Sequence, residues 1–363
     1  MRFRCERDTL YDALRTAVRA VSARGGTLPV LSGVKTELSG QELALTGSDL
    51  DLTIRASASV AGEEDGAAVV PARLWADIVR ALEPGAVSIE TDGEHARITA
   101  GRSQFSVRLL TVEDFPRHTE PPAERVTLDG VALGEAVQQV VRAASHDNAR
   151  PILTGVLLAA EGDGLRLVAT DSYRLAVRDL PGLSVLAPEQ SVLVPSKALQ
   201  ELTGMLSGAE QVTLGLAEWD ATFEVGGVRL TTRLIEGDFP NYGQLIPSTV
   251  ANRLVVGREP LLEAIGRVRL LVQEGAPVRV SLRPGNVELV AMGQDGEAHE
   301  DVEAKYEGTE MTIAFNPTYL AEGIDAIRGD EVVIETTEVL KPAVVRSTER
   351  DDFLYLVMPV RTG

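Results

Sequence analysis

The sequence predicts an α+β protein made of three similar domains in tandem. Three observations lead to this fold class. The chain has 363 residues, too many for one ordinary core. Its patterns recur with a period of roughly 120 to 125 residues. Each period holds two amphipathic helical patterns among short alternating strands. We expect the domains at residues 1–121, 122–250 and 251–363, with boundaries in the polar stretches RHTEPPAER and IPSTVANR.

The first domain opens with a helix predicted over residues 6–24, where apolar residues recur every three or four positions from Leu10 to Val21. The alternating stretches TLPVLSGVKTEL and LALTGSDLDLTI are typical of strands. A second helix is predicted over residues 73–80, after the proline of VVPARLWADIVRAL, because proline is favoured at helix starts.

The second and third domains repeat this order. In the second, helices are predicted over residues 131–150 and 197–208, and ARPILTGVLLAA and LRLVATDSYRLAV match the strands of the first domain. TVEDFPR and IEGDFPN place Pro116 and Pro240 in register. The third domain is a weaker copy, with helices predicted over residues 258–274 and 317–328.

An aspartate falls at the matching turn of each repeat, at Asp49, Asp171 and Asp295. Because aspartate accepts hydrogen bonds from nearby backbone amides, turn chemistry explains this recurrence better than catalysis does. Paired carboxylates such as Asp351 and Asp352 are the strongest argument for an enzyme. The sequence contains no glycine-rich phosphate loop and no nucleophile elbow, so we expect no catalytic residue.

The chain ends on the apolar stretch FLYLVMPVR, residues 353–361, which is too short to span a bilayer. We interpret it as a last strand. One face is expected to complete a sheet, while the remaining residues border a binding surface. Pro359 should end the hydrogen-bond ladder because it has no amide hydrogen.

Composition narrows the class of protein further. The start MRFRCERDTL lacks the apolar core of a secretory signal, and Cys5 is the single cysteine, so we expect a cytoplasmic protein. The four histidines are scattered, and we expect neither a metal nor a cofactor.

The net charge of −19 argues against a nucleic-acid partner if it is spread evenly. It is not: the six predicted helices together carry +1, and the rest of the chain −20. Helices of this kind can face a polyanion while an acidic exterior repels stray nucleic acid. Ordinary solvated helix faces explain the same pattern, and charge alone leaves both interpretations open.

The motifs LPVLSG, TGSDLDL, VPAR, GRSQFSV, EDFP, ATDSYRLAV, GDFPNY and YLVMPVR, in this order on three tandem repeats, resemble the bacterial DNA polymerase III β subunit family, the sliding clamps. The resemblance runs nearly from end to end. It implies the DNA clamp fold, with two helices per domain on antiparallel sheets. It also implies a head-to-tail homodimer that closes into a ring around duplex DNA. A clamp carries out no reaction; it tethers polymerases and so makes them processive.

The resemblance implies sequence-independent contact with the DNA backbone at Arg24, Arg73 and Lys197. Helix periodicity adds three basic residues to this candidate set, namely Arg15, Arg19 and Arg142.

Ring closure implies a heterologous interface between the first domain of one copy and the third domain of another. One candidate edge strand is basic and the other acidic, which suits pairing. The basic strand carries Arg97, Arg102 and Arg108, and the acidic strand Asp295, Glu297, Glu300, Asp301 and Glu303. Phe105 and Leu271 resemble apolar interface positions of the family. The alternative is two unrelated exposed strands, since edge strands are commonly charged.

The resemblance also implies a hydrophobic groove between the second and third domains. In the family it receives short peptides of the DNA polymerase III α subunit, the clamp loader, other polymerases and repair proteins. The matching positions are Arg150, Leu153, Thr170, Ser172, Tyr173, Arg174, Leu175, Pro240, Leu245, Leu340, Pro342, Leu356, Met358, Pro359, Val360 and Arg361.

This chain departs from the family pattern at the groove. Many members carry Gly-His where it has Ser172-Tyr173, and it ends in Arg-Thr-Gly where the family commonly stops just after the arginine. A paralogue with a specialised role, such as resistance to a clamp-directed antibiotic, remains the alternative function.

Overall fold

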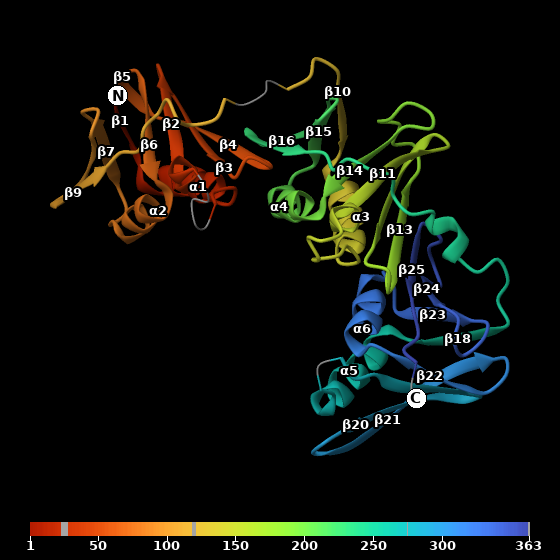
Figure 1. The fold of residues 1–363 in the computed structure, drawn as a ribbon. Coiled ribbons are helices and arrows are strands. Elements are labelled where there is room, and N and C mark those ends of the chain that lie inside the picture. Colours follow the sequence, from red (N-terminus) through yellow and green to blue (C-terminus); the bar gives the residue numbers. More distant parts are fainter. Residues whose placement is uncertain (23–27, 118–120, 274, 362–363) are drawn as a thin grey trace. The chain divides into compact units, whose positions relative to one another are not determined.

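The computed structural model describes residues 1–22, 28–117, 121–273 and 275–361. These residues form the predicted α+β fold, with helices packed on antiparallel sheets (Figure 1). They divide into two compact units. Unit 1 comprises Met1–Val131 and Glu201–Leu234, and unit 2 comprises Ala132–Gln200 and Ile235–Gly363.

Unit 1 contains a five-stranded and an eight-stranded sheet. The first has the order β5 (Ala61–Glu64), β1 (Arg2–Glu6), β7 (Ala86–Thr91), β8 (His95–Ala100) and β9 (Ser103–Arg108). The second has the order β10 (Arg125–Asp129), β15 (Gln211–Leu216), β16 (Asp220–Val225), β17 (Val228–Arg233), β4 (Leu52–Ser59), β3 (Glu42–Ser48), β2 (Gly33–Ser39) and β6 (Gly66–Pro71).

Unit 2 contains a twelve-stranded sheet. Its order is β14 (Ser191–Pro195), β11 (Gly155–Glu161), β12 (Gly164–Thr170), β13 (Arg174–Leu180), β25 (Phe353–Val357), β24 (Ala343–Ser347), β23 (Glu331–Thr336), β18 (Asn252–Gly257), β21 (Gly296–Glu307), β20 (Gly285–Gly293), β19 (Val278–Arg283) and β22 (Met311–Phe315).

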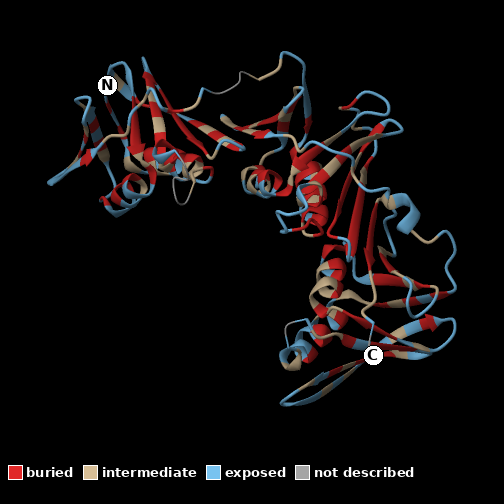
Figure 2. Ribbon diagram, viewed as in Figure 1, coloured by how far each residue is buried: buried red, intermediate tan, exposed pale blue. Residues whose placement is uncertain are grey.

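Six α-helices occur in the described residues. They are α1 (Arg7–Val18), α2 (Ala72–Ala81), α3 (Gly130–Val141), α4 (Ser196–Leu206), α5 (Arg258–Val268) and α6 (Pro317–Ala326). In unit 1 the apolar faces of α1 and α2 contribute Leu10, Leu14 and Trp75 to a core that includes Phe3 from β1 and Leu45 from β3 (buried residues are red in Figure 2). This burial of one stripe per helix is what the 3.6-residue periodicity predicts.

Three predicted helices were too long, because apolar residues continue past the point where the backbone leaves the helix. The helix expected over 131–150 ends at Val141. Ala143 and Ala144 are still buried, but their N–H groups bond three residues back, and Asp147 then accepts the N–H of Ala149. Such a side chain competes with helical hydrogen bonding and favours a turn.

The other two overlong predictions fail at similar tight turns. The helix expected over 6–24 ends at Val18, and the helix expected over 258–274 ends at Val268 and continues only as a 3₁₀ turn over Arg269–Leu271. By contrast, α6 starts where predicted. Asn316 caps it by accepting the N–H groups of Thr318 (2.9 Å) and Tyr319 (3.3 Å), directly before Pro317.

The repeats are joined by strand pairing, in the same way twice. In unit 1, β4 pairs antiparallel with β17, from Leu52↔Thr232 to Ala56↔Val228. In unit 2, β13 pairs antiparallel with β25, from Arg174↔Val357 to Arg178↔Phe353. We call these pairings joint A and joint B. Each makes one continuous sheet out of strands from two successive repeats.

A buried ion cluster lies at the end of joint B. Arg178, only 3% exposed, forms an ion pair with Asp352 and lies 3.9 Å from Glu135 of α3. Arg350 donates to Asp352 at 2.7 Å. Burial acts to raise the pKa of Asp352, but the hydrogen bonds and charges of Arg178 and Arg350 outweigh it, so the pKa is lowered.

Candidate functional site

A tight turn between β12 and β13 begins the candidate peptide-binding surface. The carboxylate of Asp171 accepts the backbone N–H groups of Tyr173 (2.9 Å) and Arg174 (3.0 Å), and the hydroxyl of Thr170 accepts that of Ser172 (3.2 Å). Within this cap Ser172 has a φ of 81°, a left-handed conformation that residues other than glycine seldom adopt. The turn chemistry predicted for Asp171 is confirmed.

The same turn occurs in the first repeat. Asp49 accepts the N–H groups of Asp51 (3.2 Å) and Leu52 (2.8 Å), Ser48 accepts that of Leu50 (3.2 Å), and Leu50 has a φ of 83°. Asp295 differs, since it lies exposed at the tip of the β20–β21 hairpin. The third repeat therefore does not build this turn at the matching aspartate.

An apolar cluster lies along joint B, next to the turn. Its buried members are Val168, Leu175, Val177, Val344, Leu354 and Leu356, and the partly buried residues packed against them are Leu157, Phe239, Tyr242, Ile246 and Met358. Leu175 and Leu356 pair across the joint and are 0% and 1% exposed. They form the layer beneath the candidate surface, whereas Met358 is half-buried at it.

The sixteen residues expected at the groove fall into three classes of exposure. The buried ones are Leu153, Thr170, Arg174, Leu175 and Leu356. The half-buried ones are Pro342, Met358, Pro359 and Val360. The exposed ones are Arg150, Ser172, Tyr173, Pro240, Leu245, Leu340 and Arg361. All sixteen lie in unit 2. We call the exposed Arg150, Ser172 and Tyr173 the rim; in it Arg150 donates to the carboxylate of Asp147 (3.0 Å) and to the hydroxyl of Ser172 (3.3 Å).

The last strand completes the sheet as predicted, and β25 is buried on both faces from Phe353 to Val357. On one side, Leu354 and Leu356 join the apolar cluster. On the other, the ring of Tyr355 packs against α6 and its hydroxyl donates to the carbonyl of Tyr319 at 3.0 Å. Beyond the strand, the N–H of Met358 donates to the backbone carbonyl of Tyr173 (2.8 Å). After Pro359, the N–H of Val360 donates to the backbone carbonyl of Ala314 (2.8 Å).

Four aromatic and aliphatic residues at this surface were missed by the sequence reasoning. Phe239, Tyr242 and Ile246 pack on the apolar cluster, and the rings of Phe239 and Tyr242 meet edge to face at 6.3 Å. The ring of Tyr319 on α6 stacks on that of Tyr173, with centroids 6.4 Å apart and an interplanar angle of 25°. Burial, followed by the nearby charge of Asp171, raises the pKa of Tyr319. The sequence around Tyr319 predicts a helix over residues 317–328 but carries no separate signal for this contact.

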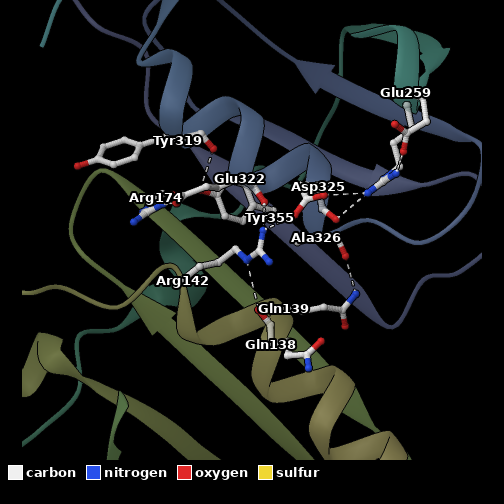
Figure 3. A network of polar contacts seen from close by, with 11 residues as sticks. Gln138, Gln139, Arg142, Arg174, Glu259, Tyr319, Glu322, Asp325, Ala326 and Tyr355 are labelled. Carbon is white, nitrogen blue, oxygen red and sulfur yellow. Dashed lines mark hydrogen bonds and ion pairs between the residues drawn. The ribbon is translucent and has the colours of Figure 1, made fainter. Parts of the chain in front are cut away.

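Arg174 connects the turn to α6 (Figure 3). Its side chain is 7% exposed and binds two carboxylates, Asp171 (Nε to Oδ2, 2.9 Å) and Glu322 of α6. Its guanidinium carbon also lies 4.3 Å from the centroid of the Tyr319 ring, a cation–π distance. The buried charge is thus neutralised from both sides.

The C-terminal end of α6 is capped by side chains from α3, from the residue that follows α3 and from α5 (Figure 3). Arg142 donates to the carbonyl of Glu322 (3.2 Å) and to the carboxylate of Asp325 (2.8 Å), and Gln139 donates to the carbonyl of Ala326 (2.7 Å). Arg258 donates to the carbonyl of Asp325 at 3.1 Å. The bonds to the carbonyls of Asp325 and Ala326 satisfy groups that a helix end leaves without partners.

The basic residues expected to meet DNA differ in their surroundings. Arg15 and Arg73 lie exposed on α1 and α2, and Lys197 lies exposed near the start of α4. Arg19 is engaged by Glu201, and Arg142 by α6 as described above. Arg24 lies outside the described residues.

The two strands expected at the dimer interface both have an open edge. β9 ends its sheet, and Phe105 on it is 38% exposed. β21 pairs with β18 only over residues 304–307, so its residues 296–303 are paired on one side alone, with β20, in the described part of the chain. Leu271 lies half-buried in the 3₁₀ turn after α5.

Some charged members of these strands have partners within the chain. Arg97 donates to Glu90 at 3.1 Å, and Glu300 accepts two hydrogen bonds from Arg267 (2.8 and 2.9 Å), which lower the pKa of Glu300. Arg102, Arg108, Glu297, Asp301 and Glu303 are exposed.

Groups that carry out chemistry are sparse. Burial raises the pKa of the Cys5 thiol to about 11, so the thiol is protonated at neutral pH. Among the described residues, no group of three or more His, Cys, Asp or Glu side chains is placed to hold a metal ion. No helix in the described part of the chain has the length and apolar character needed to cross a membrane.

Three family models match the chain in succession. Residues 1–119 match the N-terminal domain, residues 127–241 the central domain and residues 243–361 the C-terminal domain of the DNA polymerase III beta subunit.

Individual proteins match over the same length. A protein of Streptomyces coelicolor named beta sliding clamp is 38% identical over 379 aligned positions, covering 99% of each chain. The crystal structure of the DNA polymerase III subunit beta from Pseudomonas aeruginosa superposes with a TM-score of 0.92 at 30% identity, covering 100% of both chains. A C. crescentus beta sliding clamp superposes with a TM-score of 0.94 at 29% identity, covering 100% of this chain and 99% of that one.

Proposed function

The chain belongs to the DNA polymerase III beta subunit family, and we propose that it is a DNA sliding clamp, which encloses duplex DNA and tethers the replicative polymerase to it. The observation that carries this proposal is that all three domain types of the family occur once each, in order, along the whole chain. Relatives that match over the full length are named beta sliding clamp, so a specialised paralogue is not favoured.

The mechanism is topological. Two copies pair the open edge of β9 in one with the open half of β21 in the other, at both ends, and so form a closed ring with no further protein. Because the ring itself retains the DNA, contacts with the backbone can be few and weak, which permits sliding. The exposed Arg15, Arg73 and Lys197 suit such contacts.

The candidate peptide-binding surface gives the clamp its partners. A buried apolar cluster against which the half-buried Met358 packs, together with the exposed side chains of Tyr173 and Leu340, suits an extended peptide anchored by one or two large side chains. Methionine adapts to differently shaped anchors, so one surface can serve a polymerase, the loader and repair proteins in turn. We expect the protein to work in the cytoplasm as a non-catalytic subunit.

Retention on DNA tests the topological mechanism. The protein is loaded by its clamp loader onto a nicked circular plasmid, and retention is measured by gel filtration in high salt before and after linearisation. A ring held by topology stays on the circle and is lost from the linear form, because salt weakens contacts and not enclosure. Equal loss from both forms would contradict the proposal.

A further inference from the structure

Glu322 is the only carboxylate on α6 that reaches the β12–β13 turn in the described structure, and no sequence argument assigned it a role. It is half-buried, and its carboxylate pairs with Nη1 of Arg174, the arginine whose Nε holds Asp171. Asp171 in turn holds the backbone of Tyr173. A continuous chain of polar contacts therefore runs from α6 to the rim of the candidate peptide-binding surface.

The same contacts fix the aromatic part of that rim. The guanidinium of Arg174 lies against the Tyr319 ring, and Tyr319 stacks on Tyr173, whose side chain is 59% exposed. The backbone of Tyr173 is held by the turn below it and by the N–H of Met358, which donates to the carbonyl of Tyr173 at 2.8 Å. The ring of Tyr173 lies beside that of Tyr319, and Arg174 contacts both the turn and the Tyr319 ring.

We propose that Glu322 is a positioning residue for peptide binding: by pairing with Arg174 it holds the Tyr173–Tyr319 stack in the arrangement that an incoming peptide meets. This proposal rests on the proposed peptide-binding function. The proposal extends that function by naming a residue that affects the peptide through other residues and not by touching it.

The physical reason is the burial of Arg174. A buried guanidinium that loses one of two partners must find water or another acceptor, and the side chain then leaves its place. Asp171 remains, so the turn still forms for part of the time. If the competent arrangement falls to about a tenth of the population, the apparent affinity falls about tenfold, because only that fraction binds.

The test measures the dissociation constant of a fluorescein-labelled peptide with the C-terminal tail sequence of the replicative polymerase from the same organism. The proteins are the full-length wild type, Glu322→Ala, Glu322→Gln, Met358→Ala and a matched control, Glu263→Ala. Glu263 is an exposed glutamate of the neighbouring helix α5, 3.7 Å from Arg267. Glu322→Ala should weaken binding about tenfold. Glu322→Gln should recover part of the loss, since its amide oxygen still accepts from Arg174. Glu263→Ala should bind as the wild type does.

A second readout separates positioning from general destabilisation. The chain has six tyrosines, so 3-fluorotyrosine labelling gives six fluorine resonances, assigned by Tyr→Phe variants. In Glu322→Ala the resonances of Tyr173 and Tyr319 should shift, and that of Tyr11 on α1 should not.

The outcomes are distinguishable. Wild-type affinity in Glu322→Ala, together with weakened binding in Met358→Ala, would overturn the role of Glu322 alone. A shift of all six resonances, or an equal loss of affinity in Glu263→Ala, would overturn it as well, in favour of loosened folding. No binding by the wild type, or unchanged binding in Met358→Ala, would instead overturn the peptide-binding function itself.

Discussion

At the scale of single residues, the two buried arginines of β13 each lie close to two carboxylates. Arg178 at joint B has Asp352 on one side and Glu135 on the other, and Arg174 has Asp171 and Glu322. Each arginine also sits on β13, so both clusters hold the strand that joins the second repeat to the third. Removing one partner leaves an unpaired charge that water solvates poorly. The resulting loss in free energy of unfolding is larger than the net contribution of the ion pair.

The ion pair of Asp352 should make part of the stability depend on pH. Its pKa is lower in the folded chain than the ordinary value of 3.8. The pair therefore stabilises the fold fully above that ordinary value, and the contribution is lost as the pH falls through the lower, folded value. We expect Asp352→Asn to lower the free energy of unfolding by about 1–3 kcal/mol at neutral pH.

Urea unfolding of both proteins from neutral pH down to about pH 3 checks this, because the difference between them should shrink over the acid part of the range. A difference that stays constant across the range would contradict the assigned role of the charge.

At the scale of elements, close packing of α6 against β25 requires Gly323. A Cβ atom added there would overlap the ring of Tyr355, whose side chain is fully buried. Alanine is a better helix former than glycine by about 1 kcal/mol, so propensity alone favours Gly323→Ala. We expect the opposite, a loss of about 1–3 kcal/mol, because overpacking outweighs propensity.

Gly266 on α5 provides the matched control. It is exposed, and an added Cβ meets nothing within 4 Å. Gly266→Ala should therefore raise the free energy of unfolding by about 0.5–1 kcal/mol. Thermal and urea unfolding measure both variants, and stabilisation by Gly323→Ala would show that the helix and strand can move apart freely.

The sequence was most informative about the positions of the helices and strands. Apolar periodicity located all six described helices, because each buries one stripe against a sheet. Periodicity placed some helix ends too late in the sequence, since a turn buries Ala143 and Ala144 as completely as a helix would. The sequence identified the last strand of joint B but not how it packs: only the contact of α6 with Tyr355 shows what covers the second face of β25. Tyr319 and Glu322 were missed for the same reason, as a contact between repeats leaves no local pattern.

At the scale of the whole molecule, the open edges of β9 and β21 should decide the oligomeric state. We expect a dimer in solution, near twice 38.8 kDa, and Phe105→Asp should shift it toward the monomer. The substitution removes an exposed apolar side chain from the edge and adds a negative charge where the partner strand is acidic.

Light scattering on a gel-filtration column measures the mass. Trp219→Asp is the control, because it also changes an exposed aromatic residue, 56% exposed, to aspartate, and Trp219 lies between β15 and β16 and on neither edge strand. A dimer that withstands Phe105→Asp, or dissociates equally in Trp219→Asp, would refute the assigned interface.

Joints A and B have a consequence for how such a ring comes apart. Both are formed by strands of one polypeptide, so the local concentration of one edge around the other is fixed by the connecting chain and does not change on dilution. The contacts between copies have no such tether. Dilution acts on them alone, so in a ring of two copies of this chain the contacts between copies should open before joints A and B do. We therefore expect DNA to enter between copies, where the strand pairs lack a covalent link.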